Sequence, residues 1–211
     1  MRGLFLTSWL VEDLIEVNKS FASEVCLITS ASSKTSIALA HCVKVRGKLT
    51  SIGITSPGNV AFCKALGCYD QVLTYNDIAN MDASQAAVMV DMAGNAEVIS
   101  QVHHHYGDNM KYSCRIGATH FDKMGSSKNL PGATPEFFFA PSHREARSAE
   151  LGSDAFTKQM WKAFANFRKF CDNWMSIEYS YGPDAVKHTY QSILTGKANP
   201  ATGQIVSISP K

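Results

Sequence analysis

The sequence predicts an α/β protein with a doubly wound parallel sheet, followed by a mostly helical C-terminal segment. Short apolar runs alternate with helix-length stretches from residue 25 to residue 116, an alternation typical of β-α-β units. Crossovers between parallel strands are almost always right-handed, which leads to a doubly wound sheet. After residue 140 the apolar residues recur at helical spacing. We therefore expect the sheet in residues 1–140, and helices with one closing strand in residues 141–211.

The composition is that of a globular protein and argues against several classes of function. Of the 211 residues, 45% are hydrophobic and 18% are charged, and the net charge is +2. A chain of this length and hydrophobic content can form a well-cored domain. The sequence has no basic stripe of the kind that nucleic acids require, and no apolar run of the roughly 20 residues that span a membrane. Six scattered cysteines without a Cys-x-x-Cys pair suit reduced, buried thiols. We expect a cytoplasmic protein that binds neither nucleic acid nor membrane.

The apolar N-terminal stretch Gly3–Val11 imitates a signal peptide only faintly. Glu12 and Asp13 follow it at once, and no small-residue cleavage site is present. We interpret the stretch as a short strand or turn that leads into a helix carrying Leu14 and Ile15.

A turn rich in small hydroxyl residues, Ser30–Ser36, connects the buried strand Val25–Ile28 to a helix predicted at about 34–46. Such a turn can hold a phosphate, because the free N–H groups and the positive dipole end of the helix face the anion. The three glycines of a dinucleotide fingerprint are absent, and serines stand at that spacing instead. The alternative is a solvated turn in which Ser32 or Ser33 caps the helix. The candidate phosphate-binding residues are Ser30, Ser32, Ser33, Lys34, Thr35 and Ser36.

The remaining elements follow in order. Gly47 ends the first helix as a left-handed cap would. Shorter helices are predicted at 60–66 and 96–106. Further strands are predicted at 48–54, 71–73, 86–90, 111–116 and 136–140. The C-terminal segment is expected to be helical over most of 142–174, with a strand at 177–179, a helix at 183–194 and a final strand at 204–208.

The end of the second strand bears on the choice of cofactor. A carboxylate there would bind the ribose 2′-hydroxyl of NAD, whereas its absence admits the 2′-phosphate of NADP. The segment Thr55-Ser56-Pro57-Gly58-Asn59 contains no carboxylate. Thr55 and Ser56 are therefore candidate cofactor-binding residues, and NADP (as NADPH) is favoured.

The nicotinamide half of such a cofactor is expected at the carboxyl ends of the fourth to sixth strands. His120 is the titratable ring at one of these strand ends, so it is the candidate proton donor. The alternative is that His120 only caps a loop. The candidate neighbours of the nicotinamide are Ala93, Gly94, Gly117, Ala118 and Thr119.

The tract His103-His104-His105 looks like a metal site, but its residues are consecutive on a predicted helix. Three consecutive side chains spread over about 200° of the helix surface and cannot converge on one ion. His41-Cys42 also lacks the spacing of a zinc site. We expect no metal cofactor.

Four segments, taken in order, resemble the cofactor-binding half of the medium-chain dehydrogenase/reductase superfamily. The turn at 28–36 stands where that superfamily has its glycine-rich loop, and Lys64-Ala65-Leu66-Gly67-Cys68-Tyr69-Asp70-Gln71-Val72-Leu73 resembles its K-x-L-G-A-D-x-V passage. Val90-Asp91-Met92-Ala93-Gly94 is similar to its D-x-x-G strand end, and 179–206 to its closing helix and strand. The serine-substituted turn and the opening Leu4-Phe5-Leu6-Thr7-Ser8-Trp9 more closely resemble the DUF2855 family.

The resemblance implies that residues 1–140 form a Rossmann-like nucleotide-binding domain. It implies an NADP-linked, zinc-independent oxidoreductase that transfers hydride to a carbonyl or an activated alkene of a small-molecule substrate. It also implies a homodimer through the edge strand Glu136–Ala140, whose apolar residues need cover.

The substrate domain of that superfamily has no counterpart in this sequence. The chain is a fragment, or its tail packs differently, or a partner supplies the missing half. The alternative function is a degenerate Rossmann-type module that binds a nucleotide or a partner protein without catalysis. The missing glycines and the missing domain both favour this alternative.

Overall fold

The computed structural model describes residues 1–116 and 130–210. The chain forms two compact units, Met1–Phe164 and Ala165–Lys211. No helix within the described ranges is both long enough and apolar enough to cross a membrane.

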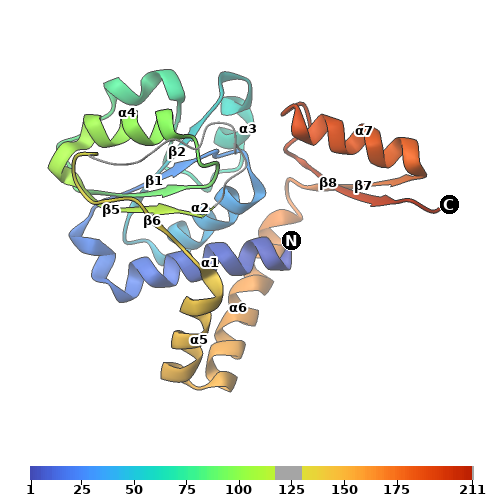
Figure 1. Cartoon of the computed structure of the whole chain (residues 1–211). Helices are drawn as coiled ribbons and strands as arrows, with labels where there is room; N and C mark the ends of the chain where they lie inside the picture. The colour runs from blue at the N-terminus through green and yellow to red at the C-terminus, as the bar shows by residue number, and fades with distance from the viewer. Residues whose placement is uncertain (117–129, 211) are drawn as a thin grey trace. The chain divides into compact units, whose positions relative to one another are not determined.

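The first unit is built on a six-stranded parallel sheet with the strand order β3-β2-β1-β4-β5-β6 (Figure 1). The strands are β1 (Val25–Thr29), β2 (Thr50–Thr55), β3 (Gln71–Thr74), β4 (Ala87–Asp91), β5 (Met110–Arg115) and β6 (Glu136–Phe137). The strand order reverses between β1 and β4, so the carboxyl ends of these two strands form the topological switch point where α/β sheets bind ligands. The predicted Rossmann-like, doubly wound sheet is confirmed.

Helices cover both faces of this sheet, with α1 and α2 on one face and α4 on the other (Figure 1). The helices of the first unit are α1 (Arg2–Val17), α2 (Lys34–Arg46), α3 (Val60–Ala65), α4 (Ala96–Tyr106), α5 (Ala140–Leu151) and most of α6 (Ser153–Cys171). Short 3-10 helices are η1 (Lys19–Ala22), η2 (Pro57–Asn59), η3 (Tyr75–Asn80) and η4 (Gly107–Asn109).

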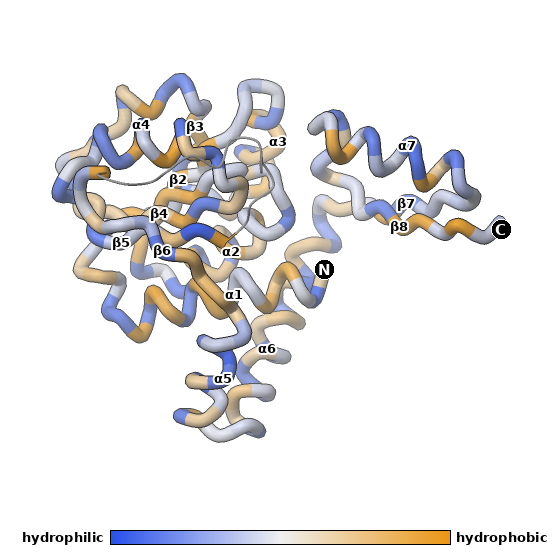
Figure 2. The backbone as a smooth tube through the Cα atoms, in the orientation of Figure 1, coloured by the Kyte–Doolittle hydropathy of each residue, from blue (hydrophilic) through white to orange (hydrophobic). Residues whose placement is uncertain are grey.

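One hydrophobic core lies between the central strands and α4. Leu27, Met89 and Met110 are buried there with Ile99 and Val102. These core positions alternate along the strands and recur at helical spacing in α4, where hydrophobic and hydrophilic stretches of the tube alternate (Figure 2). β1 and β4 are buried on both faces, whereas in α4 the apolar spacing marks the face that packs in this core.

The N-terminal stretch is a single helix, so the expectation of a strand or turn at 3–11 was wrong. Phe5, Trp9 and Leu10 are all buried within α1. Phe5 and Trp9 are four residues apart and therefore lie on one face of the helix, and Leu10 is buried next to Trp9. The apolar run is therefore part of α1, although one of its members, Leu4, is 44% exposed.

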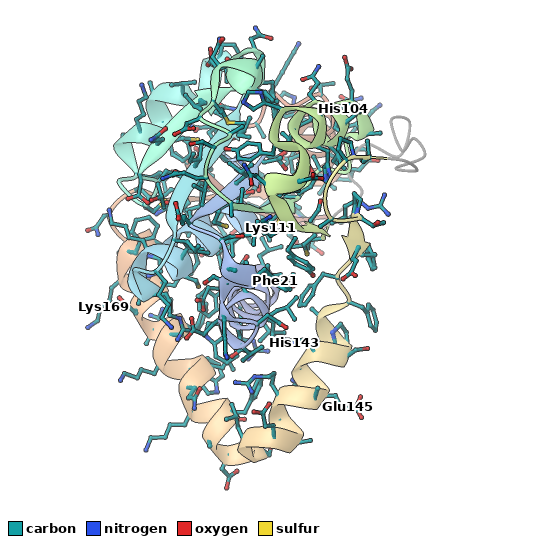
Figure 3. The ribbon with its side chains drawn as sticks, turned by 90° about the vertical axis from the view of Figure 1, so that its left-hand side faces the viewer. Phe21, His104, Lys111, His143, Glu145 and Lys169 are labelled. Carbon is teal, nitrogen blue, oxygen red and sulfur yellow. The ribbon has the colours of Figure 1, made fainter. Side chains whose placement is uncertain are left out.

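A left-handed turn, η1, follows α1. The φ angles of Lys19, Ser20, Phe21 and Ala22 lie between 51° and 55°. Each such non-glycine residue costs roughly 1–2 kcal/mol, so packing must hold the turn. The Phe21 ring stacks on that of Tyr112, with 4.1 Å between ring centroids and an interplanar angle of 4°; Figure 3 labels Phe21 near Lys111 of β5.

The sixth strand is shorter than predicted, since it covers Glu136–Phe137 rather than 136–140. The helix α5 already begins at Ala140 with Pro141 in its first turn, where proline is favoured because its missing N–H needs no partner. The side chains of Phe137 and Phe139 are 63% and 59% exposed.

An ion-pair network joins α5 to α1. Arg147 Nε donates to Asp13 Oδ2 at 2.7 Å, and His143 Nε2 lies 2.9 Å from the same oxygen. These contacts hold α5 against α1 within the first compact unit, which extends to Phe164; the sequence analysis had divided the chain at residue 140. The apolar periodicity after residue 140 does not reveal which unit a helix belongs to.

The second unit contains a β-α-β arrangement. Strands β7 (Ser176–Tyr181) and β8 (Thr202–Ser207) pair in parallel, and α7 (Pro183–Leu194) connects them. The predicted strands and helix of this region are present, with β7 longer than expected.

Candidate functional site

The turn after β1 is closed by two of the predicted serines. Ser33 Oγ accepts a hydrogen bond from Ser36 N at 3.1 Å and so caps α2. The buried Ser36 hydroxyl donates to the carbonyl of Thr29 at 2.8 Å. The capping role considered for Ser33 is therefore present. The cap satisfies one of the four N–H groups that begin a helix without an intrahelical partner.

The first serine of the turn adopts a backbone conformation that usually requires glycine. Ser30 has a φ of 50°, and its N–H donates to Tyr75 Oη at 3.3 Å. Ala31, the next residue, donates its N–H to the carbonyl of Ile54 at 3.0 Å. The turn is thus tight, with serine rather than glycine at its left-handed position.

Two residues that the sequence analysis did not assign to the site, Tyr69 and Gly53, pack against this turn. Tyr69 Oη donates to the carbonyl of Ala31 at 2.8 Å, and burial raises the pKa of Tyr69 well above its usual value. Gly53 of β2 makes room for this contact, because a Cβ there would lie 2.8 Å from Tyr69 Cδ1. A glycine inside an apolar strand is a sign of close backbone approach, and this signal could have identified the position.

The rim of the site is formed where the turn meets the end of β2. Asn59 Nδ2 donates to Ser32 Oγ at 3.0 Å and to Ser56 Oγ at 3.1 Å. Ser32 and Ser56, predicted from separate segments, are therefore brought together, and Asn59 joins them. Thr55 is 1% exposed, so its side chain is buried beneath this rim.

A buried carboxylate organises the other side of the switch point. Asp91 Oδ1 accepts from Thr29 Oγ1 at 2.6 Å, and Asp91 Oδ2 accepts from Gly94 N at 2.6 Å. Thr29 Oγ1 also accepts from Met92 N at 3.2 Å. Burial raises the pKa of Asp91, although the hydrogen bonds from Thr29 and Gly94 oppose the shift. Asp91 thereby fixes the turn that carries the predicted residues Ala93 and Gly94.

The first turn of α2 holds the remaining candidates of the loop. Lys34 and Thr35 are partly exposed, and burial lowers the pKa of Lys34. The carbonyl of Thr35 accepts from Ser8 Oγ of α1 at 2.7 Å. The start of α2 is thus anchored on α1.

Four predicted residues of the nicotinamide side, Gly117, Ala118, Thr119 and His120, lie outside the described residues. The last described strand residue before them is Arg115, which the sequence analysis did not consider. The Cα register pairs Arg115 of β5 with Asp91 of β4. A positively charged residue therefore stands next to the Asp91 carboxylate at the carboxyl edge of the sheet.

The histidines of α4 point to different partners. His103 is buried, with Nε2 2.9 Å from Ser113 Oγ and Nδ1 2.9 Å from the carbonyl of Pro131. His105 Nε2 lies 2.7 Å from the carbonyl of Met81. Within the described residues, no three His, Cys, Asp or Glu side chains are grouped as a metal site requires.

Three of the solved structures with a similar fold are bacterial proteins. CurA from Vibrio vulnificus, in complex with NADPH, matches with a TM-score of 0.65 and 13% identity over 100% of this chain and 63% of that chain. YhdH from Escherichia coli K-12, with bound NADPH, matches with a TM-score of 0.60 and 10% identity over 97% and 62%. A putative NADPH:quinone reductase from Mesorhizobium loti matches with a TM-score of 0.59 and 13% identity over 94% and 58%.

At these identities the likeness establishes the fold, and the chain spans about three fifths of the length of these proteins. No curated protein matches the sequence. A family model described as "Protein of unknown function (DUF2855)" matches residues 1–199. The chain therefore belongs to the DUF2855 family.

Proposed function

We propose that this protein binds NADPH at the switch point and acts as an NADP-linked, zinc-independent oxidoreductase. The observation that carries the proposal is the tight turn at Ser30–Ser36, which leads into α2 at the carboxyl edge of the sheet. Similarly folded proteins such as CurA and YhdH have been solved with NADPH. The bound cofactor would supply hydride to a carbonyl or an activated alkene, and the protein would bind and orient the reactants.

The cofactor phosphates would be held at the start of α2. The free N–H groups and the positive dipole end favour an anion there, and Lys34 adds a cation in the first turn. At the rim, the Asn59 amide and the hydroxyls of Ser32 and Ser56 form a cluster of polar groups at the end of β2. No carboxylate stands at that strand end, which favours the 2′-phosphate of NADP over the free hydroxyl of NAD.

The nicotinamide would lie against the turn fixed by Asp91. Both oxygens of this carboxylate already accept hydrogen bonds, so Asp91 would position Ala93 and Gly94 rather than contact the reacting atoms. His120 stays the predicted proton donor. The substrate-binding site would be completed by groups from a further domain, in the same or another chain, because this chain spans about three fifths of the length of its solved neighbours.

A second candidate function is a Rossmann-type module that binds a nucleotide or a partner protein without catalysis. The glycine-free turn favours it, since the hydroxyls of Ser33 and Ser36 are used to hold the turn itself. In this case a nucleotide or a partner protein would bind, and no model substrate would be reduced.

A thermal-shift titration with NADPH, NADH and ATP tests the proposal. We expect a larger rise in melting temperature with NADPH than with NADH, and turnover of model enones or aldehydes by the NADPH complex. Lys34→Glu should abolish the shift, because it places a carboxylate at the phosphate site. Lys158→Glu, an exposed charge reversal on α6, is the matched control and should leave the shift unchanged. No shift with any nucleotide would refute cofactor binding, and a shift without turnover would favour the binding module.

We also propose a homodimer through the edge of the sheet at 136–140. β6 is the last strand in the sheet order, and no strand of the described residues pairs with its outer edge. The rings of Phe137 and Phe139 in this segment are exposed, and such an edge needs cover. Phe137→Glu should convert a dimer into a monomer in analytical ultracentrifugation. A wild-type protein that sediments as a monomer at all concentrations would refute the dimer. The buried, free cysteines suit a reducing compartment such as the cytoplasm.

A further inference from the structure

Arg115 occupies the carboxyl end of β5, in the half of the sheet proposed to face the nicotinamide. The strand register pairs its Cα with that of Asp91 on one side and with that of Phe137 on the other. Ser113, two residues earlier, contacts His103 of α4. Because strand residues two apart share a face, Arg115 lies on the α4 face of the sheet.

The guanidinium of Arg115 lacks a bonded counter-ion among the residues that the structure describes. The positive charge of Arg115 opposes the rise in the pKa of Asp91, and the two oxygens of that carboxylate accept hydrogen bonds from Thr29 and Gly94. Across residues 1–116 and 130–210, no ion pair within 4.0 Å involves Arg115. Its Nε is buried and has no hydrogen-bond partner in the same ranges.

A buried donor on a charged group is costly unless a partner satisfies it. The backbone around Arg115 is fixed, since its carbonyl accepts from Phe138 N at 2.9 Å and Ile116 N donates to the carbonyl of Asp91 at 2.9 Å. The side chain is thus presented from a rigid strand end, as a binding residue requires. A planar guanidinium fork matches a carboxylate with two parallel hydrogen bonds.

We propose that Arg115 binds an anionic group of the substrate, so that the protein prefers organic carboxylates over neutral analogues. This inference rests on the proposed oxidoreductase function and names the substrate class of the same site. Asp91 is held in place beside Arg115 and forms no ion pair with it within the described residues. The guanidinium of Arg115 is therefore available to bind a ligand at this strand end. Arg115 is thereby a specificity-determining residue.

Calorimetric titration of benzoate and of its neutral analogue benzamide into the NADP⁺-saturated protein tests the inference. We expect wild type to bind benzoate roughly 10-fold to 100-fold more tightly than benzamide, as charge-assisted hydrogen bonds would give. Arg115→Gln should remove this preference. Arg115→Lys, which keeps the charge without the fork, should retain part of it. Lys111→Gln is the matched control, because Lys111 is an exposed cation on the same strand (Figure 3) and should change neither affinity.

Two results would overturn the inference. Wild type binds benzoate no better than benzamide, or Arg115→Gln keeps the benzoate preference, whether or not it weakens NADP⁺ binding. If Arg115→Gln does not fold, as judged by its circular dichroism melt, the partial loss expected for Arg115→Lys decides the question. If NADP⁺ does not bind, the proposed function fails separately, and benzoate titrated into the protein alone still tests Arg115.

Discussion

Replacing Gly53 by alanine should destabilise the site from beneath, because no side chain fits there. A Cβ at this position would lie 2.8 Å from Tyr69 Cδ1 and 2.9 Å from the Ala31 Cβ. Ordinary van der Waals contacts of a Cβ begin near 3.4 Å. Tyr69 cannot easily move away, since it is 8% exposed and its hydroxyl is bound to the carbonyl of Ala31.

The expected cost follows from this overlap. Relief requires the Tyr69 ring or the Ala31 turn to shift, and overpacking of this kind typically costs about 1–3 kcal/mol. With a urea dependence of about 2 kcal/mol per molar, the midpoint of unfolding should fall by roughly 0.5–1.5 M. Since Ala31 belongs to the proposed phosphate turn, Gly53→Ala should also weaken NADPH binding.

Urea unfolding followed by tryptophan fluorescence measures the effect. Gly58→Ala is the matched control, because a Cβ at Gly58 meets no atom within 4 Å. Equal midpoints for the two variants would refute the reasoning that Gly53 is required by the approach of Tyr69 and Ala31.

Three further predictions concern single side chains. Ser33→Ala should lower the free energy of unfolding by about 1 kcal/mol through loss of the α2 cap, and Ser33→Gly by only a few tenths; equal losses in urea unfolding would contradict the capping role. Asp13→Asn should cost about 3 kcal/mol near pH 7, because it breaks a largely buried ion pair. Burial would raise the pKa of Asp13, but hydrogen bonds from His143 and Arg147 lower it, so this cost should shrink as the pH falls below about 4; a cost independent of pH would contradict it. The pKa of Asp91 is raised by burial, so the stability advantage of wild type over Asp91→Asn should decrease as the pH rises above about 4. A difference in unfolding free energy between these two proteins that stays constant from pH 4 to pH 8 would be evidence against that shift.

Much of the fold could be predicted from the sequence, because its elements alternate and are short. The apolar run at Val25–Thr29 had to be a strand buried on both faces, and Gly47 ends α2 in the left-handed conformation, with a φ of 69°. The N-terminal helix was missed because a single short apolar run does not distinguish a strand from one face of a helix. The sixth strand was predicted too long because three phenylalanines suit a strand, whereas α5 begins at Ala140, directly after them.

The candidate site was predictable only in part. The turn at Ser30–Ser36 and the strand end at Ser56 follow from local sequence, and the structure brings Ser32 and Ser56 together. Asn59, Tyr69 and Tyr75 could not be assigned, because their contacts with the turn span 27, 38 and 45 residues of sequence. Such partners depend on strand order and register, and local patterns do not encode these.

The sequence by itself determined the class of fold, the position of the turn after β1 and the absence of a carboxylate at the end of β2. These features depend on neighbours in the chain, through apolar spacing, capping and turn chemistry. Only the tertiary structure decided that Thr29, Asp91 and Arg115 stand side by side at the carboxyl edge. Parallel pairing of β1, β4 and β5 brings them together from distant segments, and burial at that edge decides which of their charges and hydrogen bonds are satisfied.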